Sequence, residues 1–310
     1  MAKISRAIQS APIGKPEETI IKAIEEQSWL DGMAETLQHP IYQVMRQRGL
    51  LRSILNGTWL GHPVHAALTD VPVGAWAVGF ILDMLETLGL RKDLRKASDT
   101  TQTIGLMSAL GVAIFGLADW SYTNGRARRV GLVHALLNST AALVYGISLL
   151  LRSRGDRRTG IVLSNVGFGM VFFSAWLGGE LSYRFGVGVN RMAFKEEPEE
   201  WERLLPEREL HDGALHRAEA HGTPILLVKH EGQIFALGDV CTHMGCSLSE
   251  GKLLAGQVMC PCHDSHFRLV DGQVMKGPAS VAVPSYEVRI AGGFVEVRQP
   301  TPAYGMASVR

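Results

Sequence analysis

The first 240 residues contain no cysteine, although the chain of 310 residues has four. Its 31 Lys and Arg nearly balance its 30 Asp and Glu, so no positive excess favours a nucleic-acid partner. The first twenty residues have no apolar run, which predicts no secretory signal. Clustered cysteines can bind metal or pair, so their number alone does not fix the redox compartment. The length is enough for two domains.

Charges are scarce in four long apolar segments, which start at Ala66, Thr103, Val130 and Gly160. A helix crosses a bilayer core with roughly 20 mostly apolar residues. The third and fourth segments meet this without a charge. The first two are interrupted by Asp70, Asp83 and Asp119, so a buried soluble bundle is the alternative there. Four such segments joined by short basic loops favour a four-helix transmembrane bundle.

The pattern changes on both sides of these segments. Before them, "EETIIKAIEEQSWL" and "IYQVMRQRGLLRSIL" are amphipathic and helical, and the second fits either a membrane-surface helix or a helix packed on a neighbour. After them, "MAFKEEPEEWERLLP" is charged, and short β-rich runs such as "TPILLVKH" and "SYEVRI" follow. The expected division is an N-terminal segment 1–58, an all-α bundle 59–190, a linker 191–206, an all-β domain 207–300 and a tail 301–310.

The cysteines lie in two short motifs of the β domain, "CTHMGC" and "CPCHDSHF". Cys241 and His243 are followed, after sixteen residues, by Cys260 and His263. Zinc sites of two Cys and two His usually use Cys-x-x-Cys and His-x-x-x-His pairs. One Cys and one His from each loop suits a two-iron cluster with two thiolates on one iron and two imidazoles on the other. A zinc site is the alternative.

These motifs, with "DGQVMKGPA" after them, resemble the Rieske iron–sulfur family over roughly residues 205 to 300. The resemblance implies that Cys241 and Cys260 ligate one iron of a [2Fe-2S] cluster, and His243 and His263 the other. It also implies a disulfide between Cys246 and Cys262, as in high-potential members of quinol-oxidising complexes. Two free thiols are the alternative for that pair, since cytosolic thiols usually stay reduced.

Three further residues are expected to tune the cluster. Ser265 matches the family's serine hydrogen-bond donor. Phe267 stands where high-potential members have a tyrosine donor, and Asp264 stands where glycine is usual. Both departures are expected to lower the reduction potential, because one removes a donor and the other adds an anion. The loop from Lys276, "KGPASVAVP", resembles the family's proline-bearing loop over the cluster.

The helical half places several polar residues at one end if four spans alternate in direction. Ionisable groups near a bilayer are costly and often functional. A structural network, a quinone or small-ligand pocket, a b-type haem on His134 with His62 or His65, and a non-haem metal all remain open. Asp83, near the other end, is expected to be an interfacial carboxylate. The possible second site comprises His62, His65, Asp119, His134 and Glu180.

Residues 55 to 190 are similar to an uncharacterised bacterial four-helix membrane family that is often joined to a C-terminal Rieske domain. The sequence therefore predicts an integral protein of a bacterial cell membrane, which carries electrons to or from a membrane-bound or soluble redox partner. A quinol- or haem-linked oxidoreductase and a redox sensor are the alternatives. Lys and Arg are spread almost evenly over both faces. The missing signal favours a cytoplasmic β domain, whereas the implied disulfide favours the outside.

Overall fold

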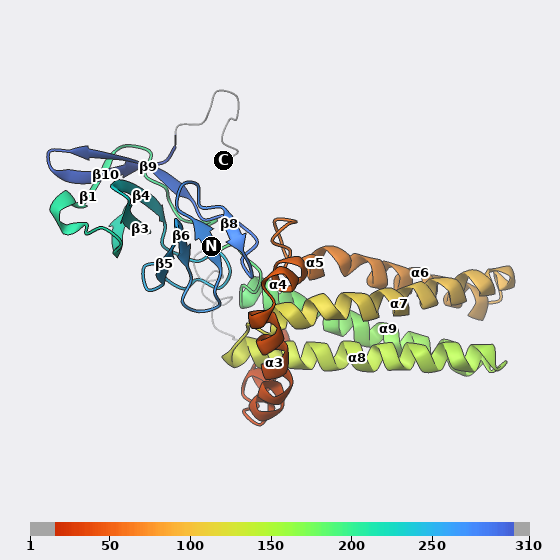
Figure 1. Cartoon of the computed structure of the whole chain (residues 1–310). Helices are drawn as coiled ribbons and strands as arrows, with labels where there is room; N and C mark the ends of the chain where they lie inside the picture. Colours follow the sequence, from red (N-terminus) through yellow and green to blue (C-terminus); the bar gives the residue numbers. More distant parts are fainter. Residues whose placement is uncertain (1–15, 301–310) are drawn as a thin grey trace, which may run out of the picture.

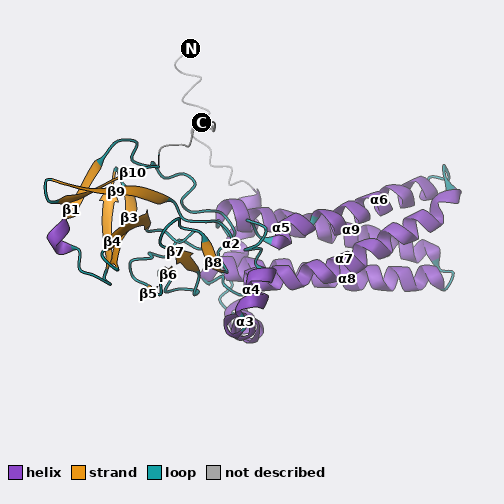
Figure 2. Cartoon of the chain, turned by 45° about the horizontal axis from the view of Figure 1, so that its top comes forward, coloured by secondary structure: helices purple, strands orange, loops and turns teal. Residues whose placement is uncertain are grey.

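The computed structural model describes residues 16–300, in which a β part sits at one end of a long helical bundle (Figure 1). The expected tail at 301–310 lies outside the described residues. The long helices lie in one part and the strands in the other, where a single short helical turn lies beside β1 (Figure 2). The helical elements are α2 (Pro16–Glu25), α3 (Leu30–Gln47), α4 (Gly49–Leu55), α5 (Val64–Leu68), α6 (Asp70–Thr87), η1 (Lys92–Leu94), α7 (Arg95–Trp120), α8 (Gly125–Ser153), α9 (Arg157–Gly179), η2 (Glu180–Arg184) and, in the β part, η3 (Glu207–Glu209).

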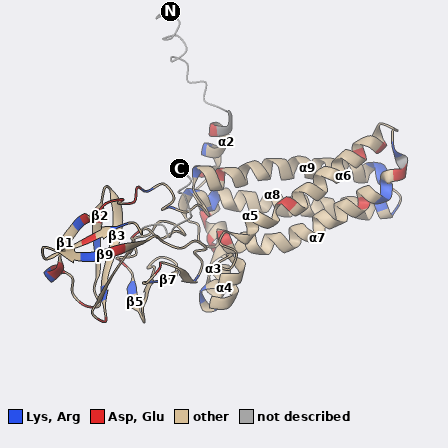
Figure 3. Cartoon of the chain, turned by 90° about the horizontal axis from the view of Figure 1, so that it is seen from above, with Lys and Arg blue, Asp and Glu red and all other residues tan. Residues whose placement is uncertain are grey.

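Four helical stretches are long and apolar enough to cross a membrane. They are Val64–Thr87, Arg95–Trp120, Gly125–Ser153 and Arg157–Arg184. Acidic and basic side chains gather near the two ends of the bundle, and most of its length carries neither (Figure 3). The predicted fold class, a four-helix transmembrane bundle followed by an all-β domain, is confirmed.

Aromatic stacking and small residues hold the bundle together in its middle. The rings of Trp76 on α6 and Tyr145 on α8 stack with centroids 4.3 Å apart. Gly105 on α7 makes room for this pair, because a Cβ there would lie 2.5 Å from the Trp76 ring. Lipid offers no hydrophobic force between helices, so such close packing carries much of their association.

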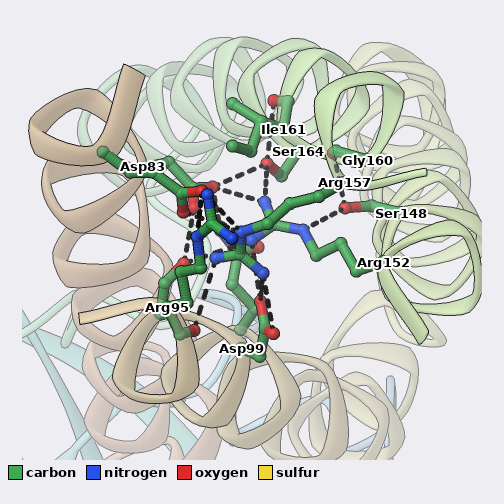
Figure 4. A network of polar contacts seen from close by, with 12 residues as sticks. Asp83, Arg95, Asp99, Ser148, Arg152, Arg157, Gly160, Ile161 and Ser164 are labelled. Atoms are coloured by element: carbon green, nitrogen blue, oxygen red, sulfur yellow. Dashed lines mark hydrogen bonds and ion pairs between the residues drawn. The ribbon is translucent and has the colours of Figure 1, made fainter. Parts of the chain in front are cut away.

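A charged network closes the bundle at the end away from the β part (Figure 4). Asp83 is fully buried and pairs with Arg152, whose guanidinium also reaches Asp99 at 2.9 Å. Ser98 and Ser164 donate to the two oxygens of Asp83. The expectation of a simple interfacial carboxylate at Asp83 was wrong, because the pairing with Arg152 lets the charge lie between helices.

The N-terminal helices pack across the other end of the bundle. In Figure 1, α3 runs steeply across the bundle beside the β part. Its buried residues Leu30 and Ala34 join Trp120 of α7 and Leu132 of α8 in one apolar cluster. The short helix α4 continues from α3 and lies against the β part. The N-terminal segment therefore bridges the two halves of the chain.

Two antiparallel sheets form the β part. The six-stranded sheet has the order β1-β10-β9-β4-β3-β2 and the four-stranded sheet the order β5-β6-β7-β8. β1 lies within the segment expected to be a linker and pairs with β10, with Glu202 opposite Val297. The strands are β1 (Glu202–Pro206), β2 (Leu215–Ala220), β3 (Thr223–His230), β4 (Gln233–Gly238), β5 (Lys252–Leu254), β6 (Gln257–Met259), β7 (His266–Arg268), β8 (Val274–Lys276), β9 (Ser285–Ala291) and β10 (Phe294–Arg298).

Both sheets position the cysteine motifs. One motif follows β4, and the other is the turn between β6 and β7. Cys241 and Cys260 belong to the apolar core that includes Leu226, Leu237 and Phe267. This core anchors each loop at its cysteine, so the rest of the loop can extend toward the bundle.

Candidate metal centre

The two cysteine loops are held by short backbone hydrogen bonds. The Cys241 amide donates to the Cys246 carbonyl at 2.8 Å, and the Cys260 amide donates to the Ser265 carbonyl at 2.8 Å. Each loop therefore closes into a tight turn whose first residue is a buried cysteine. Asp264 has a φ of 58°, the left-handed region that favours glycine, which explains why glycine is usual at this point of the turn.

Cys241 and Cys260 are free, buried thiols that face each other across the loops. A hydrogen bond between them lowers the pKa of the Cys260 thiol to about 7. The thiolate is the form that binds metal, so the lowered pKa suits Cys260 to ligation, whereas the same hydrogen bond and burial raise the pKa of the Cys241 thiol. Because both side chains are almost completely buried, a metal held here would be shielded from water.

The two histidines of the loops lie side by side. Their rings have centroids 5.1 Å apart and planes at 88°. Burial lowers the pKa of His243 to about 3, and it also lowers the pKa of His263. The Nδ1 atom of His243 is buried and has no hydrogen-bond partner among the described residues. A neutral imidazole with an unpartnered buried nitrogen is what a metal ligand requires, so the residues present fit a two-iron cluster.

A disulfide joins the loops, as the resemblance implied. Cys246 and Cys262 are bonded, with Cα atoms 6.5 Å apart. Their sulfurs and that of Cys260 lie within 4.8 Å of one another. These three sulfurs do not form a ligand set, because two of them are already bonded to each other. The disulfide instead braces the turn beside one of the free thiols.

The expected tuning residues surround the loops. Ser265 is fully buried and its Oγ accepts a hydrogen bond from the Ala279 amide at 3.0 Å, so its own proton is available to another acceptor. Phe267 is fully buried in the core and offers no donor. The Asp264 carboxylate is partly exposed and lies 3.8 Å from the Arg46 guanidinium, which offsets part of its charge. Their effects on a reduction potential stay predictions.

The histidine edge of the loops is turned toward the helical part. The ring of Tyr122, just after α7, lies edge-on to both histidines, with centroids 5.0 Å from His243 and 5.4 Å from His263. Tyr122 is almost completely buried and its hydroxyl lies 3.4 Å from the Asn56 side-chain oxygen. The Asn56 amide in turn donates to Asp119 at 3.0 Å. A continuous row of side chains thus connects the loops to the end of α7.

Helix α4 and the loop after it clamp the same edge. Arg52 donates to the backbone oxygens of His263 and Asp264, at 3.3 and 3.2 Å. The Thr58 hydroxyl donates to the Ala279 carbonyl at 3.0 Å, and the Gly277 amide donates to the Ser53 hydroxyl at 3.3 Å. These contacts join residues more than 200 positions apart in the chain, so the motif-based reasoning missed Arg52, Asn56 and Tyr122. The sequence does show several arginines before the first span, including Arg52, but there they bear only on which end of the bundle faces the cytoplasm.

The five residues of the possible second site lie at the expected end of the bundle but do not all converge. The His65 and His134 rings have centroids 6.4 Å apart. Both nitrogens of His134 are engaged, Nδ1 with the Ser174 carbonyl and Nε2 with Asn138. A haem iron would have to displace one of these bonds. The other three are engaged elsewhere: Asp119 with Asn56, Glu180 with Arg184, and His62 with the carbonyl of Pro63.

Comparisons with known proteins cover both halves of the chain. A family model for the Rieske [2Fe-2S] domain matches residues 200–287. A second model, described as a predicted membrane protein (DUF2231), matches residues 61–191. The two matches together cover the four apolar spans and the β part up to the start of β9.

Individual relatives each match about a third of the chain or less. The ferredoxin component of the alkene monooxygenase system of Xanthobacter autotrophicus is 35% identical over 101 residues, 32% of this chain and 82% of that protein. The ferredoxin component of the naphthalene 1,2-dioxygenase system of Pseudomonas aeruginosa is 28% identical, over 32% of this chain and 95% of that protein. The Rieske subunit of the cytochrome bc1 complex of Streptomyces lividans is 42% identical, over 22% of this chain and 40% of that protein. The chain therefore spans most of each ferredoxin and less than half of the bc1 subunit.

Proposed function

Because this chain belongs to the Rieske [2Fe-2S] family through its C-terminal β domain, we propose that it is a membrane-anchored carrier of single electrons. Cys241 and Cys260 would hold one iron, and His243 and His263 the other. When bound, such a cluster supplies a one-electron couple whose potential is raised by the histidine ligands. The named relatives, ferredoxin components and a bc1 subunit, support an electron-transfer role of this kind.

The observation that carries the proposal is the direction of the histidine edge. His243 and His263 face Tyr122 and α4 at the end of the bundle that carries the β domain. The proposed site of electron exchange therefore lies at the membrane surface, and its partner is a membrane-associated redox protein. Fixing the β domain there raises its effective concentration toward such a partner compared with a free ferredoxin.

The chain's own residues perform three tasks at this site. The burial of Cys241 and Cys260 excludes water. The disulfide between Cys246 and Cys262 fixes the spacing of the two loops. The polar face of the bundle, including Asp119 and Asn56, holds Tyr122 against the histidines. We assign these polar residues the role of positioning Tyr122. The proposal needs no haem or quinone in the bundle.

An EPR-monitored redox titration of the full chain in detergent tests the proposal. The expected result is a Rieske-type signal from reduced, iron-replete protein that is lost in His263→Ala. His216→Ala is a matched control, because His216 lies on β2 outside the loops and its loss should leave the signal intact. Protein that binds zinc, or iron-replete protein without the signal, would contradict the proposal.

The side of the membrane on which the β domain lies stays a prediction from the sequence, with the cytoplasm expected. Protease treatment of vesicles of known orientation tests it through the charged stretch 194–200. Cleavage only in inverted vesicles is the expected result, and cleavage only in right-side-out vesicles would reverse the assignment.

A further inference from the structure

Arg52 is a charged side chain that lies almost completely buried where α4 meets the β domain. It is 1% exposed and is among the largest fully buried side chains of the described residues. Two of its nitrogens donate to the backbone oxygens of His263 and Asp264, and its Nε has no partner among the described residues. A buried guanidinium normally pairs with a carboxylate. Here the carboxylate of Asp264 is engaged with the exposed Arg46 instead.

Arg52 can link the two halves of the chain, because it belongs to the helical half and contacts a loop of the β domain. Arg52 belongs to α4, and its contacts reach the turn that carries His263. Reduction of a cluster held by that turn adds one negative charge to a water-excluded site. A positive charge in such surroundings acts more strongly than it would in water. Hydrogen bonds and charges close to an iron–sulfur cluster are known levers on its potential.

We infer that Arg52 is a positioning residue that raises the reduction potential of the cluster and couples that potential to docking of the β domain on α4. This inference rests on the proposed function. It also revises the expectation for Asp264, because its carboxylate lies 3.8 Å from the Arg46 guanidinium and its backbone oxygen accepts from Arg52. A bound cluster would accept one electron from an external donor, and Arg52 would stabilise the negative charge added.

The coupling runs in both directions. If docking on Arg52 makes reduction more favourable, reduction must make docking tighter by the same factor. The docking contacts available for measurement are the Ser53 bond to the Gly277 amide and the Thr58 bond to the Ala279 carbonyl. Reduced protein should therefore protect residues 49–58 better than oxidised protein does.

The first test is the midpoint potential of Arg52→Gln, which removes the charge and keeps a donor. We expect its reduction equilibrium to weaken at least tenfold, a shift of about 59 mV for one electron. Arg52→Lys, which keeps the charge, should shift less. Arg48→Gln is the matched control, because Arg48 is an exposed arginine four residues earlier. A normal EPR signal in Arg52→Gln with the midpoint of Arg48→Gln would overturn the inference.

The second test needs no variant. Hydrogen exchange of the wild-type chain is measured with the protein poised above and below its midpoint. Slower exchange of residues 49–58 in the reduced state is expected, and equal exchange in both states would overturn the coupling. Because this test uses protein with a Rieske-type signal, its failure leaves the electron-carrier proposal standing, whereas absence of the signal defeats that proposal itself.

A second, independent observation concerns the outer surface of α3. Met33, Leu37 and Val44 are each exposed by 38% or more, and their spacing puts them on one side of the helix. They adjoin the buried row of Leu30, Ala34 and Met45 rather than lying opposite it. The apolar arc of α3 is thus wider than its contact with the bundle.

Two contacts of α3 fix the direction of this exposed row. Gln38 donates to the carbonyls of Trp120 and Thr123, at the end of α7. Arg46 reaches Asp264 of the β domain. Arg46 therefore lies on the side of α3 that faces the β domain, whereas Gln38 faces the end of α7. The helical spacing puts the row of Met33, Leu37 and Val44 on the side opposite Arg46, away from the β domain.

The structure assigns the row of Met33, Leu37 and Val44 to the acyl-chain boundary of the bilayer. The polar side, with Glu35 and His39 exposed, then faces water, as in helices that lie in the plane of a membrane surface. The row adjoins Leu30 and Ala34, which pack on Trp120 of α7 and Leu132 of α8. Embedding α3 in this way would fix the height of Arg52 and the docked β domain above the membrane.

Spin labels at Leu37→Cys and His39→Cys test this assignment in phosphatidylcholine vesicles. A label at Leu37→Cys should collide mainly with oxygen, which concentrates in lipid, and a label at His39→Cys mainly with a water-soluble nickel complex. Equal nickel accessibility at both sites would overturn the assignment. Exclusion of both reagents from Leu37→Cys would also overturn it, because it would indicate a protein partner on this surface.

Discussion

The Tyr122 ring meets the His243 ring edge-on, with centroids 5.0 Å apart and planes at 90°. Tyr122 belongs to the helical half and His243 to the β domain, so this contact closes the interface at the proposed centre of electron exchange. The same ring also touches His263. The bundle therefore covers the histidine edge as well as anchoring the domain.

Removing the Tyr122 ring should uncover that edge. In Tyr122→Ala, a small external reductant should reduce the cluster faster, because the two histidines lose their covering ring. The variant should also lose about 3–5 kcal/mol of stability, as expected for deletion of a buried aromatic ring. Stopped-flow reduction followed by absorbance measures the rate. Tyr122→Phe is the control, since it keeps the ring, and a rate for Tyr122→Ala equal to that control would contradict the docked arrangement.

The four proposed ligands should be individually required. Cys241→Ala, His243→Ala, Cys260→Ala and His263→Ala should each abolish the Rieske-type signal, because each removes a bond to iron. Iron content and EPR on purified protein provide the measurement. Cys246→Ala with Cys262→Ala should keep the signal, since these sulfurs are already bonded to each other. A surviving signal in any of the four single variants would contradict the assigned ligand set.

The disulfide should contribute stability rather than ligation. Loss of the bond in Cys246→Ala with Cys262→Ala should destabilise the β domain by about 2–4 kcal/mol. Denaturant titration followed by loss of cluster absorbance measures the difference. An unchanged midpoint of denaturation would show that the buried core alone fixes the loops.

The sequence predicts the ligand motif and the spans, but not the residues that dock the β domain on the bundle. The ligand motif was readable because Cys241, His243, Cys260 and His263 carry it in short stretches of sequence. The spans were readable because apolar length reports membrane insertion. Arg52 and Tyr122 were not, since their role depends on how the β domain is placed against the bundle, and local periodicity contains no information about that placement.

Asp83 illustrates the same limit within the bundle. A lone carboxylate near the end of a span gives no indication of its partner, and Arg152 lies 69 residues away in the chain. Once the helices pack, the pair is buried and shares Ser98 and Ser164.

Breaking this buried pair should be costly. Asp83→Ala should destabilise the bundle by about 3–5 kcal/mol, because it leaves Arg152 as an uncompensated buried charge. Thermal unfolding in detergent measures the loss. Asp93→Ala is the matched control, because it breaks an exposed pair with Arg91 and should cost less than about 1 kcal/mol. Equal losses would contradict the burial of the network.

The N-terminal helices should loosen in acid. The hydrogen bond from Arg129 is the main reason that the pKa of Asp31 falls to about 2 from its ordinary 3.8, against a smaller opposing effect of burial. Because this pKa is lowered in the fold, the contact stabilises the protein above about pH 4 and is lost as the pH falls toward 2. Hydrogen exchange of residues 30–47, corrected for intrinsic rates, should rise between pH 5 and pH 3. Asp31→Asn should show little of this change, and an equal rise in both proteins would assign it to another group.

The placement of the cluster at one end of the bundle is tested most directly by paramagnetic relaxation. Nitroxide labels are attached to Asn124→Cys, beside the β domain, and to Ser153→Cys, at the far end of α8, both of which are exposed positions. Reduction of the cluster should strongly enhance the relaxation of the label at 124 and leave the label at 153 nearly unchanged. Equal enhancement at both labels, or none at either in protein with a Rieske-type signal, would contradict the docked arrangement on which this account depends.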